Sequence, residues 1–136
     1  EMLKLHFSLL MFSLATFTQT QLKNDNFNSN RKENIAIKFV TLINQNFRQH
    51  KDVQYYADLL FISRTHLTRV IKEVFNINPK QIIDDKLISE TKILLLKNQL
   101  SITEIMNDLN FEDQATFSKF FKKNTGFTPT SYRKQQ

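Results

Sequence analysis

Residues 61–72 read FISRTHLTRVIK, and residues 111–122 read FEDQATFSKFFK, fifty positions later. From the seventh residue onward the two stretches agree in type: an apolar residue, a small hydroxyl, a cation, two apolar residues and a lysine. Each stretch is then followed at the same offset by a proline, Pro79 or Pro129. An internal repeat indicates that one supersecondary unit occurs twice. We expect each copy to be a helix-turn-helix, so that one chain carries two DNA-reading helices.

The composition narrows the function classes. The 136 residues carry a net charge of +6, with one glycine, two prolines and no cysteine. Lack of cysteine excludes a disulfide framework and a thiolate metal site. Scarce glycine and proline argue against a β-rich fold and exclude a glycine-rich phosphate loop. The surplus positive charge lies in residues 31–136, because two lysines balance two acids in residues 1–30. A basic domain suggests a polyanionic partner, although a solvated basic surface would give the same charge.

The first 34 residues divide into two segments. Residues 1–22 carry an apolar stripe with heptad-like spacing, which predicts a helix that packs on another domain or on a second chain. Polar residues interrupt this stretch, so it lacks the roughly 20 predominantly apolar residues that a membrane-spanning helix needs. Residues 23–34 are rich in asparagine, which favours turns over helix, and predict a linker at a domain boundary. We also expect the chain to begin inside a longer protein.

From residue 35 onward, apolar residues recur at helical spacing and predict an all-α fold of about seven helices. Cap signals mark the helix ends: Ser63 can cap one helix, a capping box begins at Ser101, and a further helix begins near Asp113 and stops at Gly126. The predicted parts are a first helix from residue 35, a helix-turn-helix at about 52–74, a linker helix at 79–97, a second helix-turn-helix at about 101–125 and a short final helix. The fold class is thus two helix-turn-helix subdomains joined by a linker helix and preceded by an extra N-terminal helix.

A recognition helix must be apolar on one side, to be held in place, and polar on the side that enters the major groove. In both repeats, the residues that do not face inward form such a polar face. Arg69 suits bidentate contact with guanine, and Gln114 suits adenine. The predicted base-reading residues are Arg64, Thr65, Thr68, Arg69, Gln114, Ala115, Ser118 and Lys119. The predicted phosphate contacts are Ser63, Lys72, Ser101, Lys122 and Lys123.

The linker helix has a length suited to spacing two such helices. About 18 residues span roughly 27 Å, and successive major-groove faces on one side of B-DNA lie about 34 Å apart. We therefore expect a monomer to read two adjacent major-groove segments on a site that need not be palindromic.

Residues 35–136 resemble the C-terminal DNA-binding domain of the AraC/XylS transcription regulators. The first repeat carries that family's Ala-x-x-Leu-x-x-Ser-x-x-x-Leu-x-Arg pattern, from Ala57 to Arg69. The second carries a longer signature, from Ser101 through Gly126 and Pro129 to Arg133. Two departures are Met106, where the family usually has alanine, and Asn110, where it has glycine.

The resemblance implies a sequence-specific, cytoplasmic regulator of double-stranded DNA, commonly an activator, with RNA polymerase as a further partner. It also implies that residues 1–22 are the last helix of a preceding regulatory or dimerisation domain. A homodimer would then form through residues 1–22 or through the missing domain.

Two other readings compete with DNA binding. An enzyme is disfavoured because His6, His50 and His66 lack metal-ligand spacing, and the adjacent carboxylates Asp84 and Asp85 point in different directions on a helix. We therefore expect no catalytic residue, no metal and no cofactor. A protein-interaction module would have the same helices without DNA binding, and salt dependence separates it from a DNA-binding domain.

Overall fold

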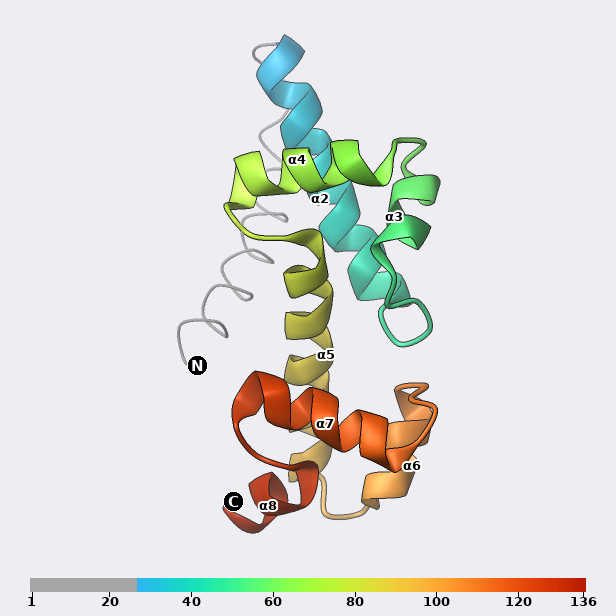
Figure 1. Ribbon diagram of the computed structural model, residues 1–136, viewed down its shortest axis with the longest axis vertical. Helices are drawn as coiled ribbons and strands as arrows, with labels where there is room; N and C mark the ends of the chain where they lie inside the picture. The colour runs from blue at the N-terminus through green and yellow to red at the C-terminus, as the bar shows by residue number, and fades with distance from the viewer. Residues whose placement is uncertain (1–26) are drawn as a thin grey trace. The chain divides into compact units, whose positions relative to one another are not determined.

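The computed structural model describes residues 27–136, where helices joined by short turns form all the regular secondary structure and no strand occurs (Figure 1). The all-α prediction is therefore confirmed. The predicted N-terminal helix over residues 1–22 lies outside the described residues. The helices are α2 (Phe27–Asn46), α3 (Val53–Leu59), α4 (Arg64–Phe75), α5 (Pro79–Leu96), α6 (Ile102–Asp108), α7 (Gln114–Thr125) and α8 (Pro129–Lys134).

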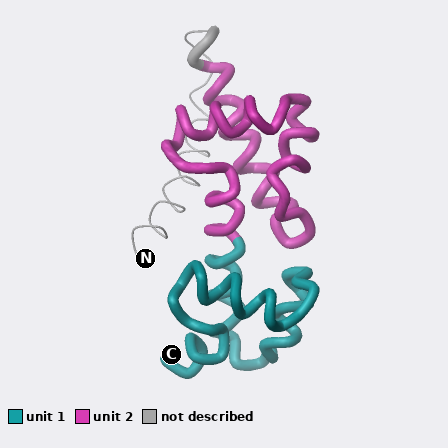
Figure 2. The backbone as a smooth tube through the Cα atoms, in the orientation of Figure 1, with its two compact units in different colours: residues 1, 87–136 teal, residues 2–86 magenta. Residues whose placement is uncertain are grey.

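The described chain divides into two compact units between residues 86 and 87, inside α5 (Figure 2). The N-terminal unit contains α2, α3, α4 and the first half of α5. The C-terminal unit contains the second half of α5 with α6, α7 and α8. Each unit thus contains one of the two predicted helix-turn-helix pairs, α3 with α4 and α6 with α7.

The core of the N-terminal unit is formed where α4 packs on α2 and α3. Phe39 and Tyr56 meet edge to face with ring centroids 5.7 Å apart. The Tyr56 hydroxyl donates a hydrogen bond to the His50 carbonyl, which satisfies the polar end of this buried ring. Burial, together with the neighbouring Tyr55, raises the pKa of Tyr56. The other fully buried side chains of this unit include Ile43, Leu67, Ile71 and Ile83.

The core of the C-terminal unit includes Phe117 and Phe121, both fully buried. Thr91 is also fully buried on α5, and its hydroxyl donates to the Leu87 carbonyl one turn earlier. This bond to its own helix satisfies the buried hydroxyl of Thr91.

Arg133 on α8 closes the C-terminal end of α5. Its Nε donates to the Leu95 carbonyl at 3.0 Å, and a terminal guanidinium nitrogen donates to the Lys97 carbonyl at 3.3 Å. The last carbonyls of a helix have no partner within the helix, and a cation near them also interacts favourably with the helix dipole. Arg133, the last residue of the sequence signature, therefore fixes the short C-terminal helix to α5.

The prediction of a turn-rich linker over residues 23–34 is wrong for residues 27–34, because α2 begins at Phe27. Asparagine disfavours helix only weakly, and tertiary contacts override such preferences. Here Lys32 forms an ion pair with Glu73 of α4. Whether this segment also marks a domain boundary stays a prediction.

Candidate nucleic-acid interface

The two predicted recognition helices, α4 and α7, begin and end with equivalent caps. At the N-terminus, the Ser63 hydroxyl accepts from the His66 amide at 3.0 Å, and the Asp113 carboxylate accepts from the Thr116 amide at 2.6 Å. At the C-terminus, Asn76 and Gly126 both adopt the left-handed conformation. Every one of these positions is offset by fifty residues, as in the sequence repeat. The boundaries of both helices therefore follow from local capping chemistry.

The preceding helices α3 and α6 are offset by forty-nine residues, not fifty. Their equivalent starts are Val53 and Ile102, and their equivalent turn hydrogen bonds run from the Ile62 amide to the Ala57 carbonyl and from the Phe111 amide to the Met106 carbonyl. The alignment of Phe61 with Phe111 is therefore wrong: Ile62 is the partner of Phe111, and Phe61 is the partner of Asn110. The second turn contains one additional residue, Glu112.

As a consequence, Phe61 and Asn110 occupy the same left-handed position in their turns, with φ of 58° and 59°. Asparagine tolerates this conformation, whereas a phenylalanine does so at a cost of about 1–2 kcal/mol. The Phe61 side chain is also 95% exposed, so its burial does not compensate for that cost.

α4 is divided into a buried side and a polar side. Leu67, Val70 and Ile71 face the core. The opposite side has exposed Arg64, Thr65 and Arg69 with half-buried Thr68. The hydroxyl of Thr68 donates to the Arg64 carbonyl, so its methyl group and its oxygen lone pairs remain for other contacts. All the residues predicted for this face border one shared hollow of about 450 Å³, lined by Arg64, Thr65, Thr68, Arg69 and Lys72.

α7 has the same division. Phe117 and Phe121 are buried, and Thr125 at the end of the helix is buried with its hydroxyl donating to the Phe121 carbonyl. The predicted base-reading residues lie on the other side, where three are exposed and Ser118 is half-buried: Gln114, Ala115, Ser118 and Lys119.

The predicted phosphate contacts fall into two groups. Ser63 and Ser101 are exposed N-caps whose oxygens accept from the amides of His66 and Glu104. Each cap hydroxyl retains its own hydrogen for donation to an anion. The remaining group consists of exposed lysines in the second half of a recognition helix: Lys72, Lys122 and Lys123.

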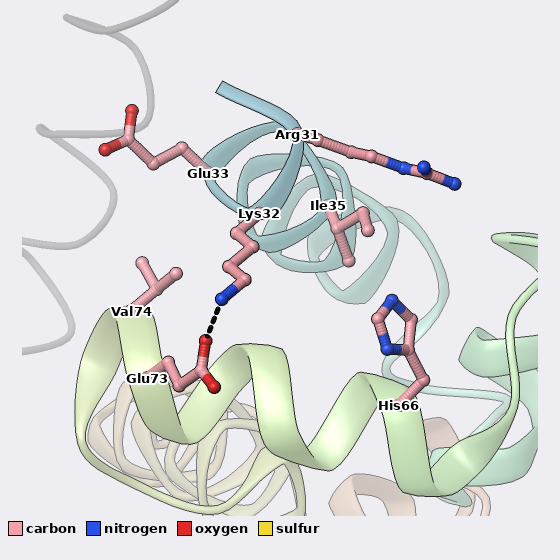
Figure 3. A pocket seen from close by; sticks show the side chains of 7 residues that line it. All are labelled: Arg31, Lys32, Glu33, Ile35, His66, Glu73 and Val74. Carbon is pink, nitrogen blue, oxygen red and sulfur yellow. Dashed lines mark ion pairs between the residues drawn. The ribbon is translucent and has the colours of Figure 1, made fainter. Parts of the chain in front are cut away.

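One interaction beside α4 is not evident from the sequence. Lys32 of α2 forms an ion pair with Glu73 of α4, with Nζ 2.6 Å from Oε2 (Figure 3). The hydrogen bond from Lys32 is the main cause that holds the pKa of the Glu73 carboxyl below its ordinary value; the charges of Arg69 and His66 act in the same direction. The pair lies in a hollow of about 800 Å³ between α2 and α4, into which His66 also projects.

The N-cap of α7 has a shifted pKa as well. Hydrogen bonds from Thr116, first its amide and then its side chain, hold the pKa of the Asp113 carboxyl below its ordinary value. The carboxylate is thus stabilised in its charged form at the positive end of the helix dipole.

Within residues 27–136, no group of three or more histidine, aspartate or glutamate side chains is placed to hold a metal ion. None of the helices described there has the length and apolar character to cross a membrane.

Comparison with known proteins identifies the family of this arrangement. Residues 56–135 match the sequence family described as "Helix-turn-helix domain". The chain is 28% identical over 129 residues to the Msm operon regulatory protein of Streptococcus mutans, covering 95% of this chain and 45% of that protein. It is 30% identical over 84 residues to the arabinose operon regulatory protein of Salmonella typhimurium, covering 62% of this chain and 30% of that protein. The chain therefore spans less than half the length of these relatives.

Solved structures agree with this assignment. The C-terminal domain of AraT, a response regulator from Geobacillus stearothermophilus, superposes with a TM-score of 0.69 at 29% identity, covering 75% of this chain and 85% of that one. An AraC-type transcriptional regulator from Chromobacterium violaceum shares the fold, with a TM-score of 0.66 at 21% identity over 76% of this chain and 92% of that one. The two capped helix-turn-helix units, the sequence signature and these likenesses together place the chain in the AraC/XylS family of helix-turn-helix transcription regulators.

Proposed function

We propose that the chain binds double-stranded DNA sequence-specifically and regulates transcription, with α4 and α7 each reading one major-groove segment. The observation that carries the proposal is the duplicated design of these helices. Each has a fully buried apolar side and an exposed polar side, and each is fixed by caps at the same two positions. A helix held in this way presents short polar and cationic side chains to base edges.

Within each helix, the contacts are proposed to divide by position. Side chains near the N-terminus contact bases, from Arg64 to Arg69 on α4 and from Gln114 to Lys119 on α7. Lysines further along the helix contact phosphates and add affinity without sequence information.

Several finer proposals follow from the relatives. The lactose operon transcription activator of Staphylococcus xylosus is 28% identical over 94 residues, which supports activation as the mode of regulation. An activator would contact RNA polymerase and would act in the bacterial cytoplasm, where the chromosome lies. Because the relatives are more than twice as long as this chain, we also propose dimerisation through residues 1–22 or through a further domain. Sedimentation with and without residues 1–22 tests the first route, and equal monomeric masses would exclude it.

Selection of bound sequences from a random duplex pool tests the main proposal. The expected product is an asymmetric consensus with two separate conserved blocks. Affinity for it should fall steeply between about 50 and 200 mM salt, because DNA binding releases counterions. A pool without consensus, bound with little salt dependence, would instead support the protein-interaction module.

A further inference from the structure

The ion pair between Lys32 of α2 and Glu73 of α4 lies close to Arg69, the side chain proposed to make a bidentate contact with guanine. Glu73 lies four residues after Arg69 on α4, and residues four apart are displaced by only about 40° around a helix. An arginine and a glutamate at this spacing attract one another and come within reach. Within residues 27–136, however, Arg69 forms no ion pair, whereas Glu73 is paired with Lys32.

The position of Arg69 on α4 explains why it matters that Glu73 pairs with Lys32 and not with Arg69. The residues before it, Arg64, Thr65 and Thr68, belong to the proposed reading face, while Glu73 and His66 line the hollow toward α2 (Figure 3). Arg69 lies between these two sides of α4, so its guanidinium can turn toward either. A guanidinium held by Glu73 would have to break that pair before it met a guanine.

We propose that Lys32 is a positioning residue that engages the Glu73 carboxylate and thereby leaves Arg69 available for base recognition. The same pairing neutralises an acid close to the path of the DNA phosphates, which a bare carboxylate would repel. The inference rests on the proposed function, since it assumes that Arg69 reads a base.

The C-terminal unit provides a natural contrast. At the fifty-residue offset, Arg69 corresponds to Lys119 and Glu73 corresponds to Lys123. α7 itself contains no acidic residue, so no carboxylate on that helix competes for Lys119. The pairing by Lys32 is thus specific to α4.

The test compares Lys32→Met, Glu73→Gln and the double variant. Methionine keeps most of the aliphatic stem of Lys32 and removes its charge, and Lys38→Met is the matched control because Lys38 is an exposed lysine on the same helix. The readout is the ratio of affinities for the selected duplex and for a random duplex at one salt concentration. An ion pair with both side chains about half exposed contributes little to stability, so all variants should keep the wild-type melting temperature within a few degrees.

Lys32→Met is expected to lower the affinity ratio by about two- to fivefold, the size of effect that an exposed ion pair exerts. Adding Glu73→Gln should restore the ratio, because the competing carboxylate is gone. Lys32→Met should have no effect on the ratio when Arg69 is already alanine, and Lys38→Met should leave it unchanged.

Two outcomes would overturn the inference. Equal loss on both duplexes without rescue by Glu73→Gln would show that Lys32 contacts a phosphate. An unchanged ratio in Lys32→Met would show that Glu73 does not compete for Arg69. A wild-type chain without preference for any duplex would instead refute the proposed function itself, which keeps the two failures distinguishable.

Discussion

The two recognition helices share a frame and differ in the chemistry they present. α4 and α7 are each 12 residues long, with caps at matching positions and a left-handed residue after the last turn. α4 exposes two arginines and an acid that α2 neutralises, whereas all the cations of α7 are lysines. Arginine makes planar, bidentate contacts, and lysine acts as a point charge. The comparison teaches that a duplicated fold can carry different chemistry in its two copies, and we expect α4 to contribute more to base selection than α7 does.

The turns that precede α4 and α7 also differ. The first is one residue shorter and places Phe61 in the left-handed conformation, where the second has Asn110. The first turn therefore carries more backbone strain than the second, because asparagine tolerates this conformation better than phenylalanine.

The largest effects should come from the matched core positions Leu67 and Phe117, both fully buried. Leu67→Ala should cost about 2–5 kcal/mol and Phe117→Ala about 3–5 kcal/mol of unfolding free energy, because each leaves a cavity. Urea denaturation gives the magnitude, and hydrogen exchange shows where protection is lost. Each variant should lose protection mainly in its own unit. Equal loss in both units would contradict the division inside α5.

Next in size are substitutions at the matched exposed positions Arg69 and Lys119. Arg69→Ala should cost about 1–3 kcal/mol on the preferred site and relax the preference at one base pair. Lys119→Ala should cost less, because a lysine loses one contact where an arginine loses two. Titration against single-base variants of the site measures both. If Arg69→Ala weakens random DNA equally, Arg69 contacts only phosphate and the expected greater contribution of α4 to base selection is wrong.

A smaller effect, of opposite sign in the two units, is expected at the turn. Phe61→Asn should stabilise the chain by about 1 kcal/mol, because it relieves the left-handed strain of an exposed side chain. Asn110→Ala should destabilise it, since alanine tolerates that conformation less well. Thermal melts compare the two variants. A lower melting temperature for Phe61→Asn would mean that the phenylalanine ring makes a stabilising contact.

The smallest effect concerns the N-caps. Because the folded-state pKa of Asp113 is lowered, its contribution to stability is present above the ordinary carboxyl pKa of about 4 and is lost as pH falls through the folded value. The destabilisation caused by Asp113→Ala should therefore shrink in acid. Ser63→Ala should cost the same at both pH values, because a hydroxyl cap does not titrate. Denaturation at pH 7 and pH 3 measures the difference, and parallel behaviour of the two variants would exclude a charged cap.

The features that the sequence predicted are those encoded within one helix or turn. The caps at Ser63, Ser101 and Asp113, the end of α7 at Gly126 and the inward faces of both recognition helices follow from neighbouring residues. A repeat in residue type also located both helix pairs, although the extra Glu112 shifted the register between them.

The features that the sequence did not predict depend on contacts between distant residues. The residues near Lys32 in the sequence do not indicate that it pairs with Glu73. They also do not indicate that the asparagine-rich segment around it is helical. Arg133 belongs to a recognisable signature, but its bond to the Leu95 carbonyl, 38 residues away, requires the folded unit. The DNA contacts of every exposed side chain stay predictions for the same reason, since the partner defines them.

Hydroxyl-radical footprinting on the selected duplex tests the central claim most directly. Two recognition helices that each enter a major groove should give two separate protected tracts, and Arg69→Ala should weaken protection of only one of them. A single short tract, or equal loss of all protection in Arg69→Ala, would contradict reading by two helices.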